Sequence, residues 1–142
     1  MNTEAGDGLL FLLRIPARAN RLKLIRAAVT EAASLCGCGP ECVSELVLAV
    51  DEACQNVVRH AYKNGASGDV VVELFRVGNH LEVRLTDFAP TVDPASIKPR
   101  DLKDLRPGGL GIHFIRELTE HAGFVAPPAG AGNQFLMRKR IE

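Results

Sequence analysis

The chain has 142 residues and a hydrophobic content of 46%, which suits one globular domain and argues against disorder. Lys plus Arg and Asp plus Glu both number 17, so the formal net charge is +0 and no global basic field favours nucleic acid or an anionic membrane. No apolar run approaches the roughly 20 residues that cross a bilayer, and the segment before residues 9–13 holds no Lys or Arg, unlike a secretory signal. We therefore expect a cytoplasmic protein that does not bind nucleic acid directly or insert into a membrane.

The first half of the chain predicts one strand followed by two helices. Residues 1–8 are small and polar, and we expect a flexible N-terminus there. Residues 9–15 form an apolar run ended by Pro16, which is typical of a strand. Apolar residues at three- and four-residue spacing predict a helix over 20–35 and, beyond a break rich in glycine and proline, a second helix over about 40–63.

The second half predicts four strands and one helix. In order, these are strand 70–77, strand 80–88, a long Pro-rich loop over 89–107, helix 112–121, strand 124–126 and strand 134–141. Gly78-Asn79 is a two-residue hairpin signal, and a loop as long as 89–107 is usually a functional lid or disordered. The order predicts an α/β two-layer sandwich, in which three helices cover one face of a mixed, largely antiparallel sheet within a single domain over 9–142.

The second helix carries two surfaces side by side. Its apolar stripe consists of Leu46, Val47, Val50, Ala53, Cys54, Val57 and Ala61. Glu52, Asn56 and His60 recur every fourth residue and form a polar line beside that stripe, whereas Asp51, Gln55 and Arg59 fall on the outward arc. An acid and an amide at the margin of a core suggest the wall of a pocket, and the alternative is an ordinary amphipathic helix with solvated polar residues.

Glu52 and Asn56 are suited to phosphoryl transfer. A neutral amide oxygen is a suitable ligand for Mg²⁺, which needs few protein ligands. A carboxylate one turn earlier can accept the proton of an attacking hydroxyl or water. The structural alternative is a solvated Glu and a helix-surface Asn.

Two further local patterns agree with a nucleotide site. Asp87 ends a predicted strand, where its carboxylate can accept the amino hydrogens of a purine, although an Asp before a Pro-rich segment is more often part of a turn. The run of glycines over 108–111 precedes a predicted helix, so its backbone can approach phosphates and offer free N–H groups to them. Otherwise it is a flexible hinge.

Four cysteines lie within one region of the chain, namely Cys36, Cys38, Cys42 and Cys54. The first three are compatible with a thiolate metal site. However, no CxxC pair exists and Cys54 falls in the apolar stripe, which favours buried or loop thiols. In a cytoplasmic protein we also expect no disulfides.

The order of these motifs resembles the GHKL ATP-binding family, which has the Bergerat fold. VDEACQNVVRHAY resembles the N box of that family, TDFAP its G1 box and GGLGIHFIRE its G2 box, and the likeness extends over about 13–139. The sequences AVDEACQNVVRHAY and GNQFLMRK, with VDP in a short lid, resemble most the bacterial anti-sigma factor serine kinases of the RsbW and SpoIIAB types.

The resemblance implies ATP and Mg²⁺ as cofactors and assigns a role to each site residue. Glu52 would be the general base on a partner's serine, Asn56 would hold Mg²⁺ and Asp87 would bind adenine. The phosphates would contact the G2 run, Gly108, Gly109, Leu110 and Gly111. Asn133 would lie near the adenine, where many relatives have Thr. Ala89 departs from the family, whose G1 box usually reads Asp-x-Gly, and its methyl group would stand close to the base.

By this resemblance, the chain would be an ATP- and Mg²⁺-dependent protein serine/threonine kinase that also sequesters a sigma factor and so regulates transcription. Its substrate would be a STAS-type anti-anti-sigma protein, and relatives commonly form homodimers. Two alternatives stay open. One is a partner-switching module that binds nucleotide poorly, and Ala89 is the reason to consider it. The other is an ATPase in which Glu52 activates water.

Overall fold

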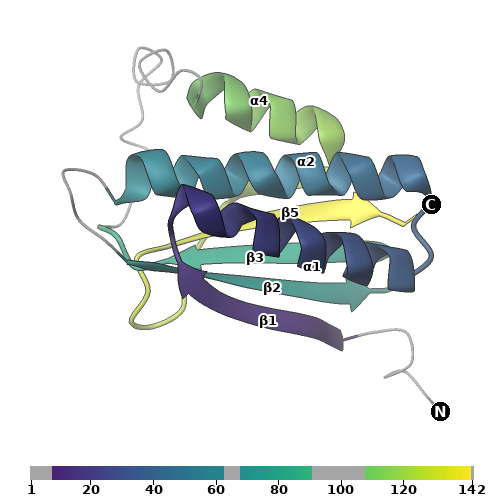
Figure 1. Cartoon of the computed structure of the whole chain (residues 1–142), viewed down its shortest axis with the longest axis horizontal. Helices are drawn as coiled ribbons and strands as arrows, with labels where there is room; N and C mark the ends of the chain where they lie inside the picture. Colours follow the sequence, from purple (N-terminus) through teal and green to yellow (C-terminus); the bar gives the residue numbers. More distant parts are fainter. Residues whose placement is uncertain (1–7, 63–67, 91–107, 142) are drawn as a thin grey trace.

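Alternating apolar and polar residues build a five-stranded sheet in the order β1-β2-β3-β5-β4 (Figure 1). The computed structural model describes residues 8–62, 68–90 and 108–141. The strands are β1 (Gly8–Pro16), β2 (Asp69–Val77), β3 (His80–Asp87), β4 (His121–Val125) and β5 (Asn133–Arg140). Every neighbouring pair is antiparallel, so within the described residues the sheet has no parallel pair, although the sequence allowed for a mixed sheet.

The register of the central strands places two polar residues of the predicted site opposite each other. Gly78, with a φ of 61°, and Asn79 close the predicted hairpin between β2 and β3. Along β3 and β5 the pairing ends with Asp87 opposite Asn133. The sheet itself therefore brings together a strand end and a strand beginning that are 46 residues apart in the sequence.

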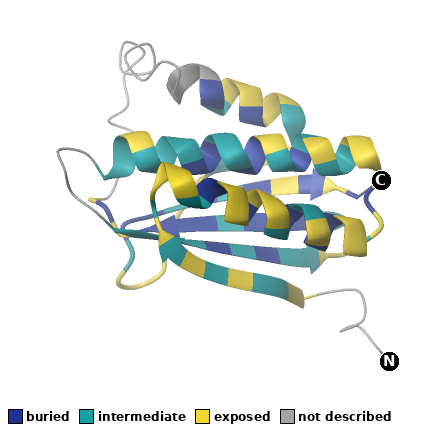
Figure 2. Cartoon of the chain, viewed as in Figure 1, coloured by how far each residue is buried: buried dark blue, intermediate teal, exposed yellow. Residues whose placement is uncertain are grey.

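Three helices cover one face of the sheet, as the sequence predicted (Figure 1). They are α1 (Leu22–Leu35), entered through the short 3-10 turn η2 (Ala19–Arg21), α2 (Pro40–Asn56) and α4 (Gly108–Leu118). Helix α2 lies between α1 and α4 and contacts both. The fully buried side chains of the core come from all of these elements, including Ile25, Leu46, Val50 and Ile115. By contrast, β1 is an edge strand without a fully buried residue, as the colours of Figure 2 show.

Several boundaries differ from the sequence prediction, most of all those of α2 and α4. Helix α2 ends at Asn56 and continues as a π-helical turn, η3 (Val57–Ala61), instead of a regular helix to residue 63. Helix α4 already begins at Gly108, so the glycine run forms its first turn and does not precede it. The same helix ends at Leu118 because the N–H of Glu120 donates to Arg138 O of β5, and His121 belongs to β4, not to the helix. The predicted long loop lies outside the described residues from position 91 to 107.

A buried lysine fixes the C-terminal end of α4. The ammonium group of Lys139, on the helix-facing side of β5, donates to Glu45 of α2 and to Leu118 O, the latter at 2.8 Å. The residue is 8% exposed, so the pairing with a carboxylate and a carbonyl offsets the cost of burying the charge. None of the described helices is both long and apolar enough to span a membrane.

Candidate functional site

Helices α2 and α4 meet where Glu52 faces Gly111. A Cβ atom added to Gly111 would overlap the Glu52 carboxylate and lie 2.9 Å from its Cδ. Only glycine therefore fits at this position while Glu52 keeps its conformation. The predicted acid and the predicted glycine run are brought into direct contact, although 59 residues separate them in the chain. The glycine run is thus needed for close packing as well as for a turn.

Glu52 and Asn56 lie one helical turn apart and share a single cation. Arg59 Nη2 donates to Glu52 Oε2 at 3.2 Å and to Asn56 Oδ1 at 3.3 Å. The Glu52 side chain is 19% exposed, so its carboxylate lies at the edge of the core. His60 falls in the π-turn and is half-buried, so the regular helical line predicted for Glu52, Asn56 and His60 ends at Asn56.

Arg59 is exposed, as predicted for the outward arc, but its guanidinium also turns toward Glu52 and Asn56. Its Nη1 donates to Gln55 Oε1 at 3.1 Å, and Gln55 Nε2 donates to Asp51 Oδ2 at 2.7 Å. Arg26 of α1 then donates to Asp51 Oδ1 at 2.8 Å. The outward arc is therefore a chain of hydrogen bonds that runs from α1 to the oxygens of Glu52 and Asn56. The spacing of seven residues from Glu52 and three from Asn56 is the sequence signal that would have indicated this contact.

Asp87 is buried at the end of β3 and 6% exposed. Its Oδ1 accepts the N–H of Ala89 and Nδ2 of Asn133, both at 3.0 Å. These are its hydrogen bonds among the described residues, which leaves Oδ2 able to accept a donor. Burial raises the pKa of Asp87, and the bonds from Asn133 and Ala89 offset part of that rise. A buried carboxylate with one oxygen available is suited to a purine amino group.

Ala89 and Gly132 make the closest backbone contact in this region. Ala89 is 5% exposed, and a Cβ atom added to Gly132 would overlap its carbonyl oxygen. Gly132 N donates to Asp87 O at 2.8 Å, and Asn133 Nδ2 also donates to Pro90 O at 3.1 Å. The G1 segment therefore rests on the start of β5. Glycine is needed at Gly132, which was not among the predicted site residues, because it packs against the Ala89 carbonyl. The methyl group of Ala89 is buried in the fold.

Tyr62 connects the helix that carries Glu52 with the strand that carries Asp87. Its hydroxyl donates to Asp69 O at 2.6 Å and accepts the N–H of Phe88 at 2.8 Å. A Cβ atom added to Gly68 would overlap the tyrosine ring, so glycine is needed there too. Burial raises the pKa of Tyr62, which keeps the hydroxyl protonated as a donor. Nothing in the local sequence pattern indicated this contact.

The glycine run supplies backbone donors rather than side chains. Because α4 begins at Gly108, the first four positions of the helix are Gly108, Gly109, Leu110 and Gly111. The N–H groups of a first helical turn have no acceptor within the helix and carry the positive end of its dipole. Such a helix start favours anions, and the contact of Gly111 with Glu52 places it beside that carboxylate.

The cysteines are free thiols. Burial raises the pKa of Cys38 to about 12, and a hydrogen bond with Cys42 adds to the effect. Burial also raises the pKa of Cys54, which lies in the core of α2. Within the described ranges no group of three or more His, Cys, Asp or Glu side chains is arranged to hold a metal ion.

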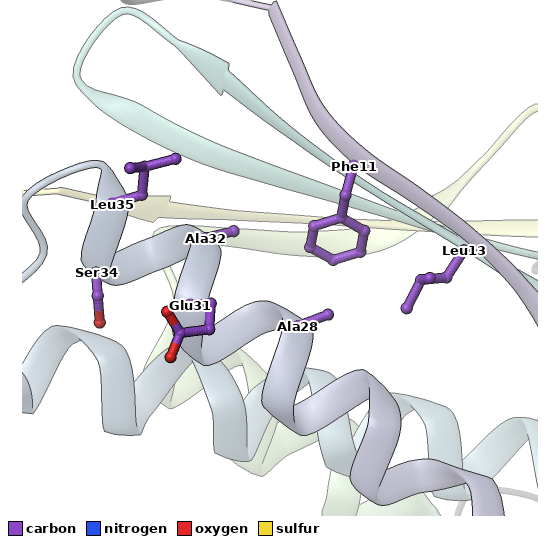
Figure 3. A pocket seen from close by; sticks show the side chains of 7 residues that line it. All are labelled: Phe11, Leu13, Ala28, Glu31, Ala32, Ser34 and Leu35. Carbon is purple, nitrogen blue, oxygen red and sulfur yellow. The ribbon is translucent and has the colours of Figure 1, made fainter.

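An open apolar groove of about 560 Å³ lies between α1 and the edge strand β1 (Figure 3). Phe11 and Leu13 of the strand and Ala28 and Leu35 of the helix line it, with Glu31 as its charged residue. None of the predicted site residues lines this groove, so it is separate from the corner of Glu52, Asn56 and Gly111.

The residues of that corner fit a magnesium-bound nucleotide. The oxygens of Glu52 and Asn56 are the hard donors that Mg²⁺ prefers. The missing side chain of Gly111 lets the Glu52 carboxylate lie directly against the first turn of α4. Asp87 keeps one carboxylate oxygen for a base amino group. When bound, the ion would neutralise charge on the phosphates while Asn56 held it and Glu52 stood beside the transferred group.

Comparison with known proteins agrees with this geometry. The family model of the histidine kinase-like ATPase domain matches residues 15–139. The chain is 33% identical over 116 residues to serine-protein kinase RsbW of Listeria monocytogenes serovar 1/2a, across 76% of this chain and 74% of that protein. It is 31% identical over 149 residues to RsbW of Bacillus pumilus, across 94% of this chain and 90% of that protein.

The fold also matches a solved structure, that of the RsbU and RsbW domains of a Mycobacterium tuberculosis protein. The TM-score is 0.63 at 19% sequence identity, and the match covers 92% of this chain. The chain spans about a third of that longer protein, since the match covers 32% of it. At this identity the similarity supports the two-layer fold alone.

Proposed function

Because this chain belongs to the GHKL, or histidine kinase-like, ATPase family, in the branch of RsbW-type serine-protein kinases, we propose that it is an ATP- and Mg²⁺-dependent protein serine kinase and anti-sigma factor. It transfers the γ-phosphoryl group of ATP to a serine of a STAS-type anti-anti-sigma protein. In its other state it sequesters a sigma factor. Its proposed location is the cytoplasm. We propose that it works there as a homodimer of a single domain over 9–142 and that it does not contact DNA directly.

One observation carries this proposal, namely the contact between Glu52 and Gly111. It brings a carboxylate of α2 against the first turn of α4, where free N–H groups favour phosphates. A base must lie within hydrogen-bond reach of the proton it accepts. Glu52 is therefore the proposed base, Asn56 the proposed magnesium ligand, and the backbone over 108–111 the proposed phosphate cradle.

The adenine is proposed to bind at the start of β5. Asp87 accepts the amino group through Oδ2, because Oδ1 is already bonded to Ala89 and Asn133. Asn133 acts by fixing the carboxylate, and Ala89 closes the site through its backbone. The packing of Gly132 against Ala89 supports this arrangement, since the methyl group is buried without displacing Asp87.

The test combines phosphoryl transfer with nucleotide binding. The chain, MgATP and its STAS partner are mixed, and phosphoserine on the partner is measured by mass spectrometry for the unaltered chain and for Glu52→Gln. We expect the variant to be slower by about 100-fold or more, the usual contribution of a general base. Glu31→Gln, the same change at an exposed residue of α1, is the matched control. Equal transfer by Glu52→Gln would exclude Glu52 as the base.

Two other outcomes point to the alternative functions. Ala89 motivates a partner-switching module that binds nucleotide poorly, and an absence of calorimetric heat with millimolar ADP would favour it. Release of phosphate from ATP without any protein acceptor would favour an ATPase in which Glu52 activates water.

A further inference from the structure

Arg59 contacts both oxygen groups on which the proposed site depends. One nitrogen, Nη2, donates to the proposed base at 3.2 Å and to the proposed metal ligand at 3.3 Å. A guanidinium and a magnesium ion are both cations that compete for oxygen lone pairs. Mg²⁺ approaches an oxygen ligand to about 2.1 Å, so an ion on Asn56 Oδ1 would lie at most about 5.5 Å from Nη2 in its present place.

The hydrogen bonds of Arg59 are long and partly exposed, so they are weak enough to break when a competing cation binds. Charge-assisted hydrogen bonds are typically about 2.7–2.9 Å long, and all three made by this guanidinium are longer, from 3.1 to 3.3 Å. Its side chain is 35% exposed, so water can replace the acceptors that it leaves. The π-turn that carries Arg59 contains no fully buried residue, although Val57 and Val58 pack against the core.

A second set of contacts keeps Arg59 in place without the metal. The amide oxygen of Gln55 accepts from Arg59 Nη1, and its amide nitrogen donates to Asp51, so both polar atoms of the amide are hydrogen-bonded. Asp51 also accepts from Arg26 at 2.8 Å. This chain restrains the conformation in which Arg59 covers Glu52 and Asn56.

We propose that Arg59 is a built-in cation that closes the corner of Glu52 and Asn56 and must leave Asn56 Oδ1 before a magnesium nucleotide binds. The inference rests on the proposed nucleotide site and adds to it a residue that sets its magnesium requirement. The ion and the guanidinium compete for Asn56 Oδ1, so nucleotide binding also releases the Glu52 carboxylate from a protein cation. Arg59 is a positioning residue in this scheme, since it contacts the proposed base and ligand rather than the substrate.

The test measures binding and needs no turnover. The affinity for ADP is determined by calorimetry over a series of Mg²⁺ concentrations for the unaltered chain and for Arg59→Gln. We expect the Mg²⁺ concentration for half-maximal effect to fall about threefold to fivefold in the variant, the size of an exposed ion pair. Thermal unfolding of the free proteins verifies that Arg59→Gln is folded.

A matched control separates the effect of the Arg59 contacts from the effect of removing a positive charge. Arg26→Gln removes the same charge from the far end of the same chain of hydrogen bonds without touching Glu52 or Asn56. We expect its magnesium requirement to stay within twofold of the unaltered chain. An equal fall in both variants, or an unchanged or higher requirement in Arg59→Gln, would overturn the role of Arg59 while leaving the nucleotide site standing. If neither the unaltered chain nor Arg59→Gln binds ADP at any Mg²⁺ concentration, the nucleotide site itself is refuted and the inference with it.

Discussion

Replacing Gly111 by alanine tests the contact on which the proposed site depends. The added Cβ would overlap the Glu52 carboxylate and lie 2.9 Å from Cδ and 3.0 Å from Cγ. The obstacle is the end of a flexible side chain, so the glutamate can rotate away while the backbone of α4 stays in place. The substitution therefore displaces the proposed base without altering any atom of it.

The opposing effects on stability nearly cancel. Alanine is more favourable than glycine inside a helix by about 1 kcal/mol. Against this gain, Glu52 loses its pairing with Arg59, and such a partly exposed pair is worth about 0–1 kcal/mol. We therefore expect the free energy of unfolding to change by less than about 1 kcal/mol. Phosphoryl transfer should nevertheless fall by about 100-fold or more, because a displaced carboxylate no longer reaches the serine proton.

Urea unfolding and phosphoserine formation on the STAS partner measure the two effects separately. Gly123→Ala in β4 is the matched control, because no atom lies within 4 Å of the added Cβ, and we expect it to leave transfer unchanged. Full transfer by Gly111→Ala would show that Glu52 needs no particular position. A loss of more than about 3 kcal/mol of stability would show instead that the carboxylate cannot move aside.

Three further outcomes follow from buried groups. Burial raises the pKa of Asp87, so Asp87→Asn should increase the midpoint temperature of unfolding, and the increase should grow as the pH rises above about 4. The same variant should bind ADP about 100-fold more weakly in calorimetry. A loss of both stability and binding would contradict this. Burial also raises the pKa of Glu82, but hydrogen bonds from its two arginine partners outweigh it and the net pKa is lowered. Glu82→Ala should lower the free energy of unfolding by about 2–3 kcal/mol in urea at pH 7, and this difference from the unaltered chain should shrink as the pH falls below about 4.5. A difference that does not change with pH would rule out ionised pairing of Glu82 with its two arginines. With an aromatic disulfide reagent, partly exposed Cys36 and Cys42 should react first, whereas Cys38 and Cys54, whose pKa values burial raises, should react only on unfolding.

Local periodicity was sufficient to predict the layers of the fold. The alternation over 70–77 and the apolar stripe of α2 each express a single buried face, so the pattern can be read without knowing the partner element. The helix boundaries were harder to predict from the sequence, because glycine on its own disfavours a helix. In α4 the contact of Gly111 with Glu52 outweighs that preference, and the glycine run is helical.

The polar connections of the site depend on tertiary contacts and were not predicted. Arg59 belongs by its helical position to the solvent-facing arc, and only the three oxygens gathered around it explain why it turns back. Tyr62 and Gly132 bond to residues that adjoin them only in the folded sheet. The roles of Glu52, Asn56, Asp87, Ala89, Asn133 and the glycine run stay predictions, now with defined distances between several of them.

The π-turn at the end of α2 has a consequence for how insertions and deletions are tolerated. A turn of this kind holds one residue more than a regular helical turn needs. Losing one residue between Val57 and Ala61 would let an ordinary helical turn form there, and the residues after it would keep nearly the same orientation around the axis. The phenol of Tyr62 would then still reach both backbone groups that it joins, Asp69 O and Phe88 N. An added residue would have no such outlet, so the spacing between the N box and the sheet should tolerate a one-codon deletion better than a one-codon insertion.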